Sequence, residues 1–85
     1  MKYFNPETKQ EIEVTEHIIT RNFWEYYIIE NVDEDQAFAL VHGHQTEMGY
    51  ISLKELKPYI ISRETNLTEL MPPIGWQVKE EETEK

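Results

Sequence analysis

The chain has 85 residues, of which 17 are acidic, 8 are Lys or Arg and none is Cys, giving a formal net charge of −9. This length predicts one domain with a modest core and argues against a deep catalytic cleft between two lobes. The lack of Cys excludes disulfides, thiolate metal sites and a cysteine nucleophile, and fits a reducing compartment. No apolar run approaches the ~20 residues that span a bilayer, and the N-terminus lacks a signal-peptide core. We expect a cytoplasmic protein without a membrane partner.

The first predicted strand covers residues 10–15, where polar and apolar residues alternate. This period of two places Ile12 and Val14 in the core and Glu11 and Glu13 in water. Residues 17–20 continue this strand or begin a second one.

The strongest predicted element is a strand over residues 23–32, because aromatic and β-branched side chains dominate it. Neither of its faces is cleanly polar, so we expect a central strand that is covered on both sides. The turn-forming residues 31–35 and the strand-like residues 36–42 predict an antiparallel hairpin. Gly43 marks the next turn, and residues 47–51 predict a short returning strand.

From Ser52 onward the sequence favours a helix, because Ser52 and Glu55 fit a capping box. Pro58 keeps this helix short. Residues 59–62 form a strand or an extended segment, residues 66–69 repeat the capping pattern more weakly, and residues 74–78 suit a last edge strand. The sum is an α+β domain over residues 1–78, a small twisted antiparallel β-sheet with one or two short helices. Residues 79–85 form a disordered acidic tail.

Two groups of residues invite a chemical interpretation, and neither supports an enzyme. His42, His44 and Glu47 have the residue types of metal ligands, but a structural site needs four ligands and a catalytic one needs three plus water. Glu25 and Glu30 point to opposite faces of one strand, so we expect one exposed carboxylate and one buried or hydrogen-bonded carboxylate rather than a catalytic pair. No phosphate-binding or dinucleotide-binding motif is present, and we expect no metal and no cofactor.

The negative charge is concentrated at the start of the chain. Residues 1–35 hold nine acids and three bases, a net −6, whereas residues 36–78 carry −1 and residues 79–85 carry −2. This balance disfavours direct binding of nucleic acid. Spaced carboxylates can instead occupy the basic groove of a nucleic-acid enzyme, although an ordinary solvated surface is the simpler interpretation. The candidate partner-binding residues are Glu11, Glu13, Glu16, Asp33, Glu34 and Asp35.

Four stretches between residues 24 and 67 form a pattern of strands and short motifs in a fixed order. An aromatic strand, 24–30, ends in Glu; a second strand, 36–43, alternates up to a turn; residues 47–56 read Glu-Met-Gly-Tyr-Ile-Ser-Leu-Lys-Glu-Leu; and residues 64–67 read Glu-Thr-Asn-Leu. This order resembles the plasmid- and phage-borne domain-of-unknown-function family 2958. The resemblance implies no catalytic residue, because that family has no established activity. It implies an accessory role, such as modulating a host nuclease, polymerase or defence system.

Two functional hypotheses follow. In the first, the chain is a non-enzymatic interaction protein of phage or plasmid type that binds, and inhibits, a host nucleic-acid-handling or defence protein through a negatively charged surface. In the second, it is an accessory or oligomerisation module that docks through an exposed aromatic patch around Trp24, Tyr26 or Trp76. The sequence leaves open which of these aromatic residues lie in the core.

Overall fold

The computed structural model describes residues 1–68 and 70–79, which form two antiparallel sheets. The smaller sheet has the order β2-β1-β8 and contains β1 (Lys2–Asn5), β2 (Gln10–Glu13) and β8 (Gln77–Val78). The larger sheet has the order β6-β5-β4-β3-β7 and contains β3 (Glu16–Thr20), β4 (Glu25–Asn31), β5 (Gln36–His42), β6 (Thr46–Ser52) and β7 (Ile60–Glu64).

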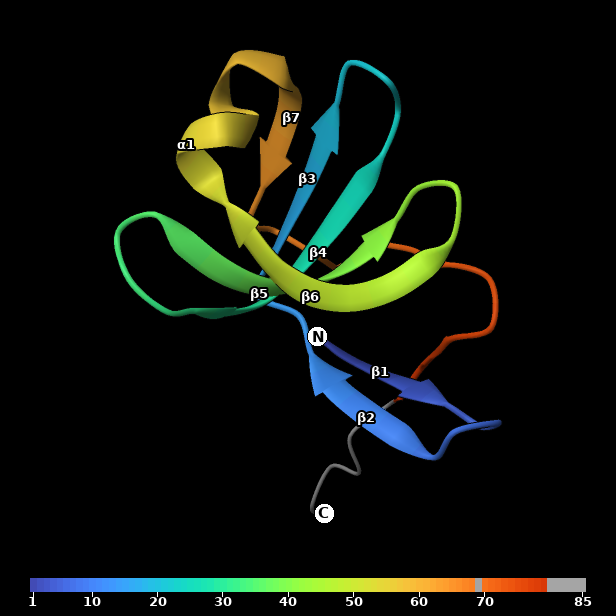
Figure 1. Cartoon of the computed structure of the whole chain (residues 1–85). Coiled ribbons are helices and arrows are strands. Elements are labelled where there is room, and N and C mark those ends of the chain that lie inside the picture. The colour runs from blue at the N-terminus through green and yellow to red at the C-terminus, as the bar shows by residue number, and fades with distance from the viewer. Residues whose placement is uncertain (69, 80–85) are drawn as a thin grey trace.

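The larger sheet is a meander that curls back toward its first strand (Figure 1). Strands β3 to β6 pair in chain order, and a short α1 (Leu53–Leu56) with the 3₁₀ turn η1 (Lys57–Tyr59) then leads to β7. Strand β7 pairs antiparallel with β3 rather than with β6.

Strand β4 lies at the centre of the larger sheet and is covered on both faces, as the sequence predicts. Tyr27 belongs to a core that also holds Tyr3, Val14, Leu40 and Trp76 and that joins the two sheets. The opposite face of the larger sheet carries a second core, around Ile18, Tyr26, Ile28, Ala37 and Ala39. Because side chains alternate along a strand, β4 supplies successive residues to two different cores.

The α+β prediction holds in outline, because one short α-helix accompanies a fold made mostly of strands. The expectation of one sheet is wrong, since β1, β2 and β8 form a sheet of their own. The Ser52 hydroxyl accepts a hydrogen bond from the Glu55 amide at 3.2 Å, which confirms that half of the predicted cap. The weaker capping pattern starts no helix at the described residues 66–68, and Glu69 lies outside the described residues.

Lys79, the first residue of the predicted tail, is attached to the smaller sheet. Its amide donates to the Lys2 carbonyl at 2.8 Å, and its ammonium lies 2.7 Å from a carboxylate oxygen of Glu11. The remainder of the predicted tail, residues 80–85, lies outside the described residues.

The turn between β3 and β4 holds a strained residue. Phe23 has φ of 66° although it is not glycine, and its side chain is 77% exposed. The Phe23 amide donates to the Thr20 carbonyl at 2.8 Å, which fixes the tight turn around it. A bulky side chain with positive φ costs conformational energy, which the surrounding turn must offset.

Replacing Phe23 with glycine should therefore stabilise the protein. We expect Phe23→Gly to raise the free energy of unfolding by about 0.5–1 kcal/mol, the cost of the left-handed conformation less the extra chain entropy of glycine. Phe23→Ala is the matched control, because it removes the ring and keeps the Cβ atom. Thermal unfolding measures both variants, and equal midpoints for glycine and alanine would contradict the prediction.

Candidate functional site

Three of the six predicted partner-binding residues are already paired with cations of this chain. Glu11 on β2 contacts the ammonium groups of Lys79 at 2.7 Å and Lys2 at 3.8 Å. Glu13 lies 2.6 Å from the N-terminal ammonium. On β3, Glu16 forms a salt bridge with Arg63 of the neighbouring β7. The hydrogen bond from Lys79 lowers the pKa of Glu11. These carboxylates stabilise contacts between strands, so they carry less free charge than the sequence implies.

Asp33 and Asp35 lie in the loop between β4 and β5 and organise it. The Asp33 carboxylate accepts from the amides of Asp35 at 2.8 Å and Gln36 at 2.7 Å. The Asp35 carboxylate accepts from the Ser52 hydroxyl and the Lys54 amide, each at 2.9 Å. These two bonds attach the loop to the beginning of α1, whose first amides need acceptors.

The same loop still presents free negative charge. Glu30, Asp33 and Glu34 are exposed, and no Lys or Arg occurs between residues 22 and 53. We call residues 30–35 the acidic loop. Because Asp33 and Asp35 hold its backbone, the acidic loop presents its carboxylates in a defined shape. Of the six predicted residues, Asp33, Glu34 and Asp35 therefore lie together in a hydrogen-bonded acidic element.

Substitution of Asp35 tests this structural role. The amide of Lys54 and the hydroxyl of Ser52 lower the pKa of Asp35, so its stabilising effect is present above the ordinary carboxyl pKa near 3.9 and is lost as the pH falls through the folded-state value. We expect Asp35→Ala to lower the unfolding midpoint by several degrees at neutral pH, with a smaller difference from wild type below about pH 4.

Glu34→Ala is the matched control for Asp35→Ala, because Glu34 is the exposed neighbour in the same loop. Its midpoint should stay close to that of the wild type at every pH. A difference between wild type and Asp35→Ala that is the same at neutral and acidic pH would contradict the assigned role.

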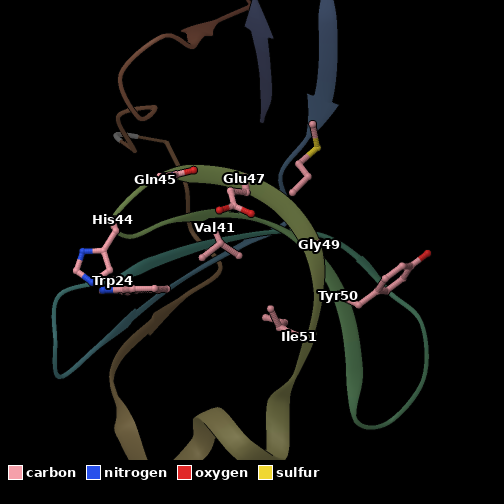
Figure 2. A pocket seen from close by; sticks show the side chains of 9 residues that line it. Trp24, Val41, His44, Gln45, Glu47, Gly49, Tyr50 and Ile51 are labelled. Atoms are coloured by element: carbon pink, nitrogen blue, oxygen red, sulfur yellow. The ribbon is translucent and has the colours of Figure 1, made fainter.

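A second candidate site is a pocket of about 320 Å³ beside β6. Figure 2 shows Val41 and Glu47 between Trp24 on one side and Ile51 on the other, while Tyr50 points away. Of the three aromatic residues predicted to form an exposed patch, only Trp24 lines this pocket, and Trp24 is half-buried. Tyr26 and Trp76 are each only 8% exposed and belong to the cores.

The Trp24 ring is held in place by the turn between β5 and β6. A Cβ atom built on Gly43 would lie 2.4 Å from the nearest ring atom, so the indole packs directly against the Gly43 backbone. The His44 ring meets the indole edge to face, with 5.3 Å between ring centroids. Only glycine at position 43 lets the Trp24 ring approach the backbone this closely. In the sequence, Gly43 is recognisable only as a turn residue.

Two glycines that flank the pocket give opposite predictions. We expect Gly43→Ala to destabilise the protein by about 1–3 kcal/mol, because the new methyl group must displace the Trp24 ring. Gly49→Ala should be close to neutral, because nothing lies within 4 Å of its Cβ position. Thermal unfolding and the indole N–H signal of Trp24 in ¹H–¹⁵N spectra measure both effects. Equal behaviour of the two variants would contradict the packing of Trp24 on Gly43.

The histidines that resembled metal ligands have other contacts. His42 Nδ1 lies 2.7 Å from the Thr46 hydroxyl, and His44 packs on Trp24. Within residues 1–68 and 70–79, no group of three or more His, Cys, Asp or Glu side chains is arranged to hold a metal ion.

Glu25 and Glu30 behave as the sequence predicts. Glu30 is exposed, whereas the half-buried Glu25 accepts a hydrogen bond from the Tyr27 hydroxyl at 3.0 Å and lies 2.9 Å from His17 Nε2. Burial, with the nearby Glu25 charge, raises the pKa of Tyr3 to about 12 and also raises the pKa of Tyr27. The Tyr27 hydroxyl also lies 3.4 Å from the Met71 carbonyl. This cluster fastens the segment around residue 71 to β3 and β4.

The sequence shows neither the partners of Glu25 nor the pocket. The cluster depends on the pairing of His17 with Tyr27 across β3 and β4, and the pocket depends on the pairing of Val41 with Glu47 across β5 and β6. The sequence signals were the expected hydrogen bonding of one of Glu25 and Glu30, the aromatic Trp24 beside a strand, and the grouping of His44 with Glu47.

No protein-family model, no curated protein and no solved structure matches this chain. The resemblance to family 2958 therefore stays a prediction. In the part of the chain that the structure describes, no helix is long and apolar enough to cross a bilayer.

Proposed function

We propose that this chain is a non-enzymatic interaction protein of phage or plasmid type that binds a basic surface on a host protein through its acidic loop. The observation that carries the proposal is the hydrogen-bonded loop of residues 30–35, with exposed carboxylates and no Lys or Arg between residues 22 and 53. A basic surface that attracts phosphates also attracts such carboxylates, so occupancy would inhibit a nucleic-acid-handling or defence protein.

The acidic loop is a better candidate interface than the carboxylates on β2 and β3. Glu11, Glu13 and Glu16 each have a cationic partner within the chain, and a host protein would have to compete with it. Glu30 and Glu34 have no such partner among the described residues. Their charge is available for long-range attraction, which screening by salt weakens.

A test of this proposal must spare the residues that hold the loop. Reversal of Asp33 or Asp35 would remove backbone hydrogen bonds, so loss of binding would not distinguish misfolding from lost contact. The double variant Glu30→Lys/Glu34→Lys changes exposed side chains only. Its matched control is Glu7→Lys/Glu55→Lys, which makes the same change in net charge at exposed positions on other elements.

We expect the wild-type protein to capture a partner from host lysate. The Glu30→Lys/Glu34→Lys variant should capture at least tenfold less of that partner. The control variant should retain most of it, and added salt or excess duplex DNA should reduce it. Circular dichroism establishes that both variants are folded. Equal capture by wild type and the Glu30→Lys/Glu34→Lys variant would contradict the proposal.

The second candidate is an accessory module that docks through an apolar surface, and the exposed Phe23 beside Trp24 favours it. Binding of this kind changes little with ionic strength, because its free energy comes from removing apolar area from water. Capture that survives moderate salt and fails in Phe23→Ala would support this second candidate instead.

A further inference from the structure

The Trp24 pocket combines apolar walls with a single carboxylate. The side chains of Trp24, Val41 and Ile51 give it apolar walls, and Glu47 is the one acidic residue in its lining. Its volume of about 320 Å³ is at the lower end of the ~300–1,000 Å³ typical of small-molecule sites. A pocket of this size suits one long side chain better than a large cofactor.

Glu47 is exposed, and it lies on the face of β6 that turns toward the second core. It shares a face of β6 with Gly49 and Ile51, and these three pair with Val41, Ala39 and Ala37 of β5. The two alanines are fully buried in the second core. The sheet therefore places a carboxylate at the open end of an apolar surface, next to Val41 (Figure 2).

Glu47 also has no cationic partner in residues 1–68 and 70–79. Among the described residues no Lys, Arg or N-terminal ammonium pairs with it, in contrast to Glu11, Glu13 and Glu16. Burying an unpaired carboxylate costs several kcal/mol. Any molecule that covers this pocket must supply a positive charge there, which selects against neutral apolar occupants.

We propose that the Trp24 pocket binds an arginine side chain of a partner protein. The aliphatic stem of the arginine packs against Val41 and Ile51, and its guanidinium binds the Glu47 carboxylate and stacks on the Trp24 indole. Arginine suits these walls better than lysine, because a planar guanidinium pairs with carboxylates in two hydrogen bonds and stacks on aromatic rings. The proposal rests on the proposed function in one respect, namely that the partner presents a basic surface.

The geometry of Trp24 supports this occupant. Gly43 covers one face of the indole, so the part of the ring that lines the pocket is its other face or its rim. The contacts with Gly43 and His44 fix the ring before any ligand arrives. A preorganised aromatic residue in a pocket is typical of the anchors that dominate binding at protein interfaces.

The test uses the full chain and a blocked Gly-Arg-Gly tripeptide as probe, followed by ¹H–¹⁵N spectra. The protein has two Trp residues, so two indole N–H signals report separately. We expect the Trp24 signal to shift and saturate, with a Kd on the order of millimolar for so small a ligand. The signal of the buried Trp76 should not move. A matching citrulline tripeptide, which is neutral, should bind at least fivefold more weakly, and a lysine tripeptide should also bind more weakly.

Two variants then separate the pocket from the fold. Glu47→Gln should weaken binding of the arginine tripeptide at least fivefold, and Gly49→Val should block it by filling the pocket from a position with open space. Glu7→Gln is the matched control and should bind as the wild type does. Thermal unfolding shows whether each variant is folded.

Several results would overturn the proposal: no shift of the Trp24 signal, equal binding of the citrulline tripeptide, or undiminished binding by Glu47→Gln. Equal affinity for the lysine tripeptide would overturn the choice of arginine. The tripeptide needs no host partner, so failure of the lysate capture and failure of the tripeptide titration are separate results.

Discussion

The fold depends on the burial of β4 from both sides. Tyr27 packs into the core between the two sheets, and Tyr26 and Ile28 pack into the core on the opposite face. A strand fixed in this way cannot slide by one residue without exchanging the contents of both cores. Its two ends are therefore fixed as well. The pocket residue Trp24 immediately precedes β4, and the acidic loop begins at the last residues of β4, so both candidate binding features adjoin a strand that is buried on both faces.

How much the sequence predicts depends on how local the signal is. Strands β4 and β5 are visible because aromatic and alternating residues follow one another, and the Ser52 cap is visible because its partner is three residues away. Strand β1 is not visible in the sequence, because a four-residue strand next to Pro6 is too short to show an alternation of polar and apolar residues. Its partners lie along β2 and at the far end of the described chain, in β8. The second sheet is a product of that long-range pairing.

The candidate site shows the same limit. Composition locates the acidic residues correctly, but it cannot show that Glu11 meets Lys79 or that Glu16 meets Arg63, because these pairs are 68 and 47 residues apart in the chain. Asp35 is a similar case, since its acceptor role depends on Ser52 and Lys54 in another element. Glu47 looks like a metal ligand in sequence, and only its pairing opposite Val41 shows that it stands beside an apolar wall.

The net charge of −9 thus divides into carboxylates that the fold uses and carboxylates that it leaves free. On the proposed function these free groups have different tasks. The exposed carboxylates of the acidic loop act at a distance, so they raise the rate of encounter with a basic partner and lose that effect in salt. Glu47 acts only on contact, beside a fixed indole, so it governs the rate of dissociation. An acidic protein that relied on the loop alone would bind many basic surfaces, and the pocket supplies the selection that charge alone lacks.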